Sequence, residues 1–198
     1  MTDSQEVVEW PVELRGVTES VVGTLGPNGQ WNFAALGLHA GEPVTARTWG
    51  RTRTRRNFHE EGGGVVQFLC DPVVFVESAL SIHERSSPVH PAAAAWARVT
   101  VESVDEGESD GTGWEQWELT PVETGIEQRT VPTTSRGYGA VIEATVATSR
   151  LDVPAYDTDE LRERLDYFAD VVATCGGERE REAMARIGEL TAWNDEIG

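Results

Sequence analysis

Short β-prone runs separated by turn residues constrain the fold of this chain more than any other feature of its sequence. Residues 21–25 and 31–38 flank the turn 26–29, which reads Gly-Pro-Asn-Gly, and this arrangement predicts a β-hairpin. Residues 44–49 alternate between two sets of side chains, as expected of a strand with two different faces. The chain is therefore expected to begin as an antiparallel sheet.

Further strands and two short helices are predicted along the next hundred residues. The strands are expected over 65–69, 92–104, 114–120 and 140–148. One helix is expected over 52–61, before a run of three glycines, and another over 73–81, after Asp71-Pro72. The acidic, glycine-rich segment 105–113 is expected to be a solvated turn. Six or seven strands with one or two short helices indicate a barrel or sandwich rather than a doubly wound sheet.

The pattern becomes helical near the C-terminus. Asp157 and Glu160 have the spacing of a capping box. Apolar side chains then recur at helical intervals in two runs, which are Leu161, Leu165, Phe168, Val172 and Cys175, and then Met184, Ile187, Leu190 and Trp193. Gly176-Gly177 separates the runs, which predicts a helical hairpin. We therefore expect a barrel domain over residues 1–150 and a helical hairpin over 151–198, packed on the barrel or on a partner subunit.

The charge balance is unusual and excludes one class of partner. The chain has 34 acidic and 16 basic residues, a formal net charge of -18, and every basic residue is an arginine. A carboxylate-rich surface repels itself unless concentrated salt screens it, which is typical of proteins from a halophilic cytoplasm. Nucleic acid is not an expected partner, because phosphate neutralisation needs a broad basic face.

Other sequence features argue against membrane, disulfide and metal sites. The acidic N-terminus lacks the pattern of a signal peptide, and the longest apolar stretch, 73–80, is short and contains Glu77. We therefore expect a cytoplasmic protein without a membrane span. Cys70 and Cys175 lie far apart and are expected to be reduced core thiols. The four histidines have no metal-ligand spacing, so no metal site is expected.

An arginine-rich segment at a predicted strand-to-helix junction is the strongest chemical signal. Residues 47–57 hold five of the 16 arginines together with several threonines. Guanidinium groups, hydroxyls and the N–H groups of a helix start all bind phosphate, so this segment predicts an anion site. Arg47, Thr52 and Thr54 are the preferred candidates. The alternative is a solvated helix face in which Arg51, Arg53, Arg55 and Arg56 pair with nearby carboxylates.

These motifs together resemble an archaeal family of unknown function, DUF447. The resemblance rests on residues 19–37, 44–48, 68–75, 140–144 and 148–151, on Arg136, and on the pattern Thr52-x-Thr54-x-x-Asn57. It implies an α+β, mostly β split barrel that binds flavin mononucleotide (FMN), with a C-terminal helical extension. It also implies a homodimer with the flavin at the subunit interface.

The resemblance assigns site residues by position. The phosphate and ribityl chain would be held by Arg47, Thr48, Thr52, Thr54 and Asn57. Asn32 and Ala34 would lie along the isoalloxazine ring, and Trp49 is the one tryptophan placed to stack on it. Arg55 and Arg56 are not part of the pattern. Glu143 is expected either in an active site or, with more weight, as the buried partner of Arg136 or Arg150.

Three functions remain open at this point. The first is an FMN-dependent oxidoreductase similar to flavin reductases, passing electrons from a reduced nicotinamide to a small substrate. The second is a non-catalytic flavin-binding or carrier module. The third is a protein that binds another phosphorylated ligand, such as pyridoxal phosphate or a sugar phosphate. No residue is predicted to be catalytic.

The acidic surface generates the first testable prediction. Dilution from molar KCl into low-salt buffer should unfold or dissociate the protein, because self-repulsion among its carboxylates is no longer screened. Circular dichroism and sedimentation against KCl concentration measure this. Full secondary structure and unchanged mass in dilute buffer would contradict the halophilic interpretation.

Overall fold

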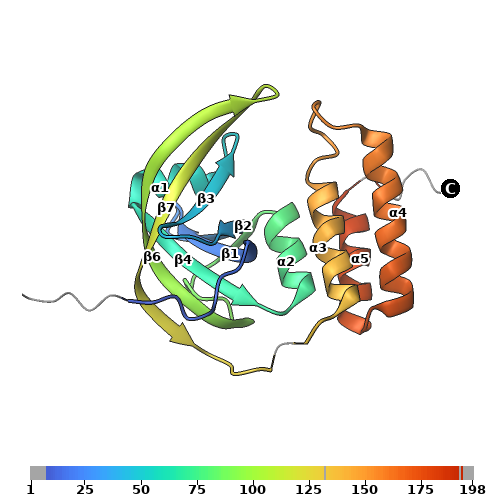
Figure 1. The fold of residues 1–198 in the computed structure, drawn as a ribbon, viewed down its shortest axis with the longest axis horizontal. Coiled ribbons are helices and arrows are strands. Elements are labelled where there is room, and N and C mark those ends of the chain that lie inside the picture. Colours follow the sequence, from blue (N-terminus) through green and yellow to red (C-terminus); the bar gives the residue numbers. More distant parts are fainter. Residues whose placement is uncertain (1–7, 132, 192, 194–198) are drawn as a thin grey trace, which may run out of the picture. The chain divides into compact units, whose positions relative to one another are not determined.

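The computed structural model describes residues 8–131, 133–191 and 193 (Figure 1). The chain divides into two compact units. The first, here the barrel unit, contains the residues up to Cys70 together with Glu84–Thr130. The second, here the helical unit, contains Asp71–His83 and the residues from Val131 onward. These units differ from the continuous ranges 1–150 and 151–198, because two helices that precede residue 150 pack with the C-terminal helices.

Six antiparallel strands form the barrel unit. They are β1 (Val17–Leu25), β2 (Trp31–His39), β3 (Val44–Trp49), β4 (Gly63–Leu69), β6 (Ala93–Ser109) and β7 (Thr112–Ile126). Their order in the sheet is β1-β4-β6-β7-β3-β2, and the additional pairing of β1 with β2 closes the barrel. The short β5 (His83–Arg85) follows β2 in that order. The predicted barrel class is confirmed.

The predicted N-terminal hairpin is confirmed. β1 and β2 pair along their whole length, from Val17 opposite His39 to Leu25 opposite Trp31. Their turn is held by a hydrogen bond from Gly26 N to Gln30 O of 2.8 Å. Gly29 has a φ of 72°, a conformation that glycine adopts without steric cost. The turn residues therefore act as the sequence indicates.

The core of the barrel follows from strand alternation. Inward-facing residues of several strands form one buried cluster, which includes Val22, Leu36, Leu38, Ala46, Val66, Val99, Trp117 and Leu119. Phe58 of α1 (Arg53–Glu61) belongs to the same cluster. Its ring centroid lies 5.2 Å from that of Trp117 in an edge-to-face arrangement. The predicted short helix is thus anchored on the barrel core.

The segment 105–113 is not the long turn that its composition predicts. β6 continues to Ser109 and β7 begins at Thr112, so Asp110 and Gly111 alone separate them. Both turn residues have positive φ, 52° and 76°. Pairing between the two strands satisfies their backbone groups even where the side chains face solvent, so acidic residues do not interrupt the ladder.

Four helices form the helical unit. They are α2 (Pro72–Leu80), α3 (Arg136–Thr148), α4 (Thr158–Cys175) and α5 (Glu178–Leu190). The helices predicted after Asp71, after Asp157 and after Gly177 are confirmed, and the carboxylates of Asp71 and Asp157 accept hydrogen bonds from first-turn N–H groups. One buried cluster spans all four helices and includes Val76, Val141, Leu165 and Ile187.

The strand predicted over 140–148 is wrong, because these residues form most of α3. Its β-branched residues alternate locally, but the buried positions Ala140, Val141, Ala144, Thr145, Ala147 and Thr148 form one helical face. α3 also approaches the neighbouring segment closely: a Cβ at Gly137 would lie 2.6 Å from the Cα of Gly176. Tertiary contacts therefore override the local strand propensity.

Two smaller expectations also fail. Glu143 is exposed on α3, so it is not a buried ion-pair partner. Cys70 and Cys175 are free thiols, as expected, but both are exposed rather than part of the core. Within the described ranges, no helix combines the length and hydropathy needed to cross a membrane.

The barrel core generates a stability prediction. Trp117→Ala removes a side chain that is 2% exposed and should lower the free energy of unfolding by about 3–5 kcal/mol. Urea unfolding in concentrated KCl measures it. Val122→Ala, at a position 45% exposed on the same strand, is the control and should change stability by at most about 0.5 kcal/mol. Equal effects would contradict this description of the core.

Candidate functional site

The start of α1 gathers positive charge. Thr52 is the N-cap residue, and its hydroxyl accepts a hydrogen bond of 3.2 Å from the N–H of Arg55. The first turn contains no acidic residue. The helix ends at Gly62, whose φ is 66°. The positive end of the helix dipole therefore lies beside arginines and is not offset by a first-turn carboxylate.

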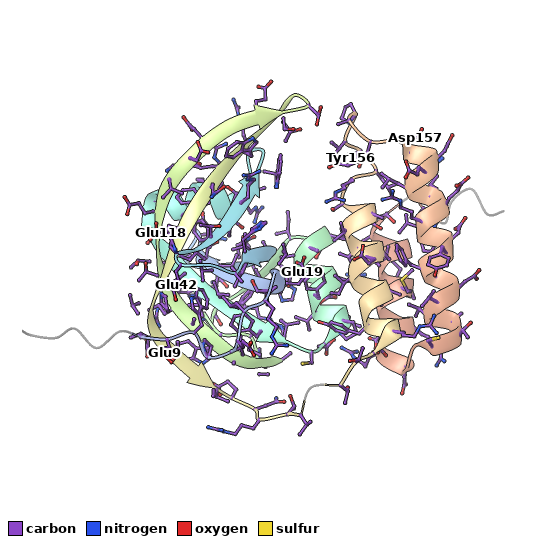
Figure 2. The ribbon with its side chains drawn as sticks, in the orientation of Figure 1. Glu9, Glu19, Glu42, Glu118, Tyr156 and Asp157 are labelled. Atoms are coloured by element: carbon purple, nitrogen blue, oxygen red, sulfur yellow. The ribbon has the colours of Figure 1, made fainter. Side chains whose placement is uncertain are left out.

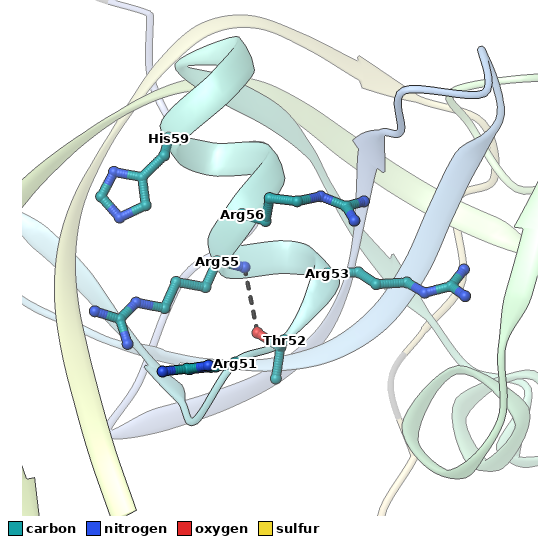
Figure 3. Close-up of a pocket in the computed structure, with 6 residues that line it drawn as sticks. All are labelled: Arg51, Thr52, Arg53, Arg55, Arg56 and His59. Carbon is teal, nitrogen blue, oxygen red and sulfur yellow. Dashed lines mark hydrogen bonds between the residues drawn. The ribbon is translucent and has the colours of Figure 1, made fainter.

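A pocket of about 590 Å³ lies at this helix start. It is lined by Arg51, Thr52, Arg53, Arg55, Arg56 and His59 (Figure 3). Arg53 and Arg56 extend to one side of the helix, and Arg55 and His59 extend to the other (Figure 3). A concave site with this set of donors is suited to an anion that accepts several hydrogen bonds, such as a phosphate.

The pocket arginines differ in their protein partners. Arg53 donates to Glu84 at 2.6 Å, and Arg56 donates to the side chain of Asn57 at 2.9 Å. Among the residues that the structure describes, Arg51 has no carboxylate within ion-pair distance. The alternative, in which these arginines pair with nearby carboxylates, therefore holds for Arg53, Arg55 and Arg56, which pair with Glu84, Glu115 and Glu60, but not for Arg51.

A buried carboxylate lies directly behind the pocket. Glu115 of β7 is 2% exposed. Its Oε2 accepts from Arg55 Nε at 2.6 Å and lies 2.9 Å from His59 Nε2. Its Oε1 accepts from Ser103 Oγ at 2.6 Å. This arrangement joins two pocket side chains to the inner face of the barrel.

The ionisation of Glu115 follows from these contacts. Burial of the side chain acts to raise the pKa of the Glu115 carboxyl. The hydrogen bonds from Ser103, Arg55 and His59 outweigh burial, so the pKa lies below its ordinary value of 4.5. The carboxylate is therefore ionised at neutral pH. Because an ionised carboxylate can only accept, His59 Nε2 carries a proton and donates to it.

Sequence reasoning missed Glu115 and left Arg55 out of the site. The available signal was position: Glu115 lies between Trp114 and Gln116, two positions before the buried Trp117 on an alternating strand. Strand alternation places it on the inward face, where an isolated carboxylate needs partners.

Three of the expected site residues lie on or beside the inner side of α1. Thr54 and Asn57 are buried, 4% and 0% exposed. Asn57 Nδ2 donates to the hydroxyl of Thr24 at 3.0 Å. Thr24 is the cross-strand partner of Asn32, which is 6% exposed. The structure thus brings Asn32 and Asn57 to one end of the barrel, around Thr24.

Thr48 and Ala34 also belong to the inner face of the barrel. The hydroxyl of Thr48 accepts from Trp117 Nε1 at 2.9 Å and lies 3.4 Å from the backbone oxygen of Glu115. Ala34 is the cross-strand partner of the core residue Val22. Of the expected phosphate ligands, Thr52 alone lines the pocket.

Arg47 and Trp49 lie on the other face of β3. Thr48 between them is buried, so strand alternation turns both side chains outward. The Arg47 guanidinium lies 4.1 Å from the ring centroid of Trp114 and 5.7 Å from that of Trp49, and it donates to Gln116 at 2.9 Å. Arg47 and the pocket are therefore on opposite faces of the β3–β7 pair.

The structure describes no candidate metal centre. Within residues 8–131, 133–191 and 193, no three His, Cys, Asp or Glu side chains gather in a way that could hold a metal ion.

The closed six-stranded antiparallel barrel, followed by helices, is the fold of the split-barrel class of proteins. Models of the protein family of unknown function DUF447 match residues 18–128, as its N-terminal domain, and residues 135–189. The chain belongs to the DUF447 family.

Several solved structures are similar to this chain to different degrees. An FMN-bound DUF447 protein from Methanosarcina mazei is 26% identical, with a TM-score of 0.76 over 90% of this chain and 96% of that one. The styrene monooxygenase flavin reductase from Pseudomonas putida S12 is 12% identical, with a TM-score of 0.43 over 59% and 93% of the two chains. Flavoredoxin from Methanosarcina acetivorans is 14% identical, with a TM-score of 0.42 over 65% and 78%.

The lowered pKa of Glu115 generates a prediction about stability and pH. A carboxyl whose pKa is lower in the folded state adds stability above its unfolded pKa, near 4.5, and this stability is lost as pH falls through the folded pKa. Glu115→Gln should therefore lower the free energy of unfolding by about 1–3 kcal/mol at pH 7. The difference from wild type should shrink below pH 4.5 in urea unfolding. A difference that is the same at pH 7 and pH 3 would contradict this assignment.

Proposed function

We propose that this protein binds FMN, with the phosphate group in the pocket at the start of α1. The observation that carries the proposal is the pocket itself, which is lined by four arginines, Thr52 and His59 in a chain whose net charge is -18. A protein with so few basic residues gathers a quarter of its 16 arginines around one helix start. The FMN-bound relative from Methanosarcina mazei supports the choice of ligand.

The donors of the pocket fit a dianionic phosphate. Guanidinium groups form paired, charge-assisted hydrogen bonds with phosphate oxygens, and the helix start adds a favourable dipole. Among the described residues, Arg51 has no carboxylate partner, so its N–H groups can donate to the phosphate. Arg53 would either release Glu84 when the ligand binds or donate to both Glu84 and the phosphate. Asn32 and Ala34 on β2 are proposed to lie along the flavin ring, whereas Trp49 lies on the outer face of β3, on the other side from these two residues.

The proposed activity is that of a flavin-dependent oxidoreductase similar to flavin reductases, with a reduced nicotinamide as electron donor. Bound FMN would supply the electron transfer, and the protein would bind, orient and shield it. A homodimer with the flavin at the subunit interface is part of the proposal, as is a small-molecule substrate.

The proposed setting is the salt-rich cytoplasm of a halophilic archaeon. Acidic side chains are exposed on both units, among them Glu9 and Glu42 on the barrel unit and Asp157 on the helical unit (Figure 2). Such a surface stays hydrated where salt screens its repulsion.

The test begins with the visible spectrum of the protein purified in concentrated KCl, followed by mass analysis of any released ligand. Flavin bands and released FMN support the proposal. Colourless protein that also fails to quench the fluorescence of added FMN contradicts it. Oxidation of NADH or NADPH above the rate with free FMN then distinguishes an enzyme from a non-catalytic flavin-binding module.

A pair of arginine variants tests the location of the phosphate. Arg51→Gln should weaken FMN binding about tenfold or more, because a charge-assisted hydrogen bond contributes about 1.5–3 kcal/mol. Arg98→Gln is the matched control, since Arg98 pairs with Glu123 elsewhere on the barrel. Flavin fluorescence titration measures both.

The same titration with Arg47→Gln tests whether the phosphate binds on the outer face of β3 instead. A large loss in Arg47→Gln with unchanged binding in Arg51→Gln would move the phosphate to the outer face and contradict its placement in the pocket.

A further inference from the structure

The side chains that line the pocket differ in how firmly the protein holds them. Arg53 and Arg56 meet carboxylates that are themselves exposed, Glu84 at 29% and Glu60 at 51%, and the Arg56 pair is 3.9 Å long. Exposed pairs of this kind are weak and leave long side chains free to move. Arg53 is therefore held loosely, whereas Arg56 also donates two hydrogen bonds, of 3.2 and 2.9 Å, to Oδ1 of the buried Asn57.

Arg55 is held at three points. Its Nε donates to the buried Glu115 at 2.6 Å, Nη1 donates to the backbone oxygen of Gly50 at 3.4 Å, and Nη2 lies 3.8 Å from Glu106. An arginine side chain loses rotamer freedom when it is ordered, and this loss opposes binding. Contacts that order Arg55 before a ligand arrives remove this cost from binding.

His59 is held by the same carboxylate oxygen. Its Nε2 lies 2.9 Å from Glu115 Oε2, and its ring packs edge-to-face on Trp117, with 4.9 Å between the ring centroids. Its side chain is nevertheless 55% exposed and lines the pocket. One buried oxygen, Oε2 of Glu115, thus orients two pocket side chains from the barrel side.

The two oxygens of Glu115 have separate partners. Oε2 contacts Arg55 and His59, the two side chains that line the pocket. Oε1 accepts a hydrogen bond from Ser103 on β6, which does not line the pocket. Arg55 and His59 both belong to α1, so Oε2 holds the helix to the barrel through two side chains that also line the pocket. Because one oxygen of Glu115 contacts pocket side chains and the other contacts the barrel, the carboxylate links the geometry of the pocket to the barrel.

We infer that Glu115 is a positioning residue for phosphate recognition, which holds Arg55 and His59 in place for the phosphate group of the ligand. Glu115 does not touch the ligand and acts through these two side chains. This inference rests on the proposed function and adds to it the residue that sets the preference for a phosphorylated flavin over an unphosphorylated one.

The test compares FMN with riboflavin, which has the same ring and ribityl chain but lacks the phosphate. Dissociation constants of both are measured by flavin fluorescence in concentrated KCl for wild type, Glu115→Gln and Glu115→Asp. Glu115→Gln should raise the dissociation constant for FMN about tenfold, as for the loss of one ordered charge-assisted contact, and leave that for riboflavin within about twofold. Glu115→Asp keeps the charge and should give an intermediate loss for FMN.

Ser103→Ala is the matched control. It removes a hydrogen bond from the other oxygen of the same carboxylate and leaves the pocket side intact. Its ratio of FMN to riboflavin affinity should equal that of wild type. Circular dichroism of each variant establishes that it is folded, and Glu115→Asp carries the test if Glu115→Gln does not fold.

The outcomes separate the inference from the proposed function. Equal weakening of FMN and riboflavin in the Glu115 variants would mean a structural role and overturn the inference, and so would unchanged FMN binding. Wild-type protein that binds neither flavin would instead overturn the proposed function.

Discussion

The pairing of β1 with β2 on one side and β4 on the other closes the sheet, and the rest of the barrel unit depends on this closure. Closure removes both edges of the sheet and creates an interior that Trp117 and its neighbours fill. It also leaves an end of the barrel at which polar side chains meet α1. Thr24, Asn57 and Glu115 are buried there with partners, so the helix is positioned by hydrogen bonds as well as by Phe58.

The overall negative charge of the chain contrasts with the arginines that line the pocket at the start of α1. An acidic surface repels anions, so an anion site requires a concentration of arginine large enough to reverse the local potential. The strand-to-helix junction gathers four arginines at a helix start, and Glu84, Glu115 and Glu60 pair with three of them. Glu115 moderates this positive charge without occupying the pocket, because it approaches Arg55 and His59 from the barrel side. The arginines therefore supply the positive charge at the pocket, and Glu115 orders two of the side chains that line it.

The sequence predicted several local features that turn and cap residues marked. The hairpin around Gly29, the helix that begins near Thr52 and the cap at Asp157 are where they were expected. It failed at residues 140–148, where β-branched residues alternate locally but pack as a helix, and at 105–113, where polar residues belong to a paired strand. Of the expected site residues, Thr52 lines the pocket while Arg47 faces away, because one step along a strand reverses the direction of a side chain.

The sequence alone determined that the chain is acidic, that its barrel is mostly β, and that arginines and threonines gather at one junction. These properties depend on composition and on contacts between near neighbours in the chain. The tertiary structure decided which arginines share a pocket, that Glu115 lies behind it, and that residues 136–148 join the helical unit. Those outcomes depend on contacts between residues far apart in the chain, 60 positions apart for Arg55 and Glu115, and local patterns do not encode such contacts.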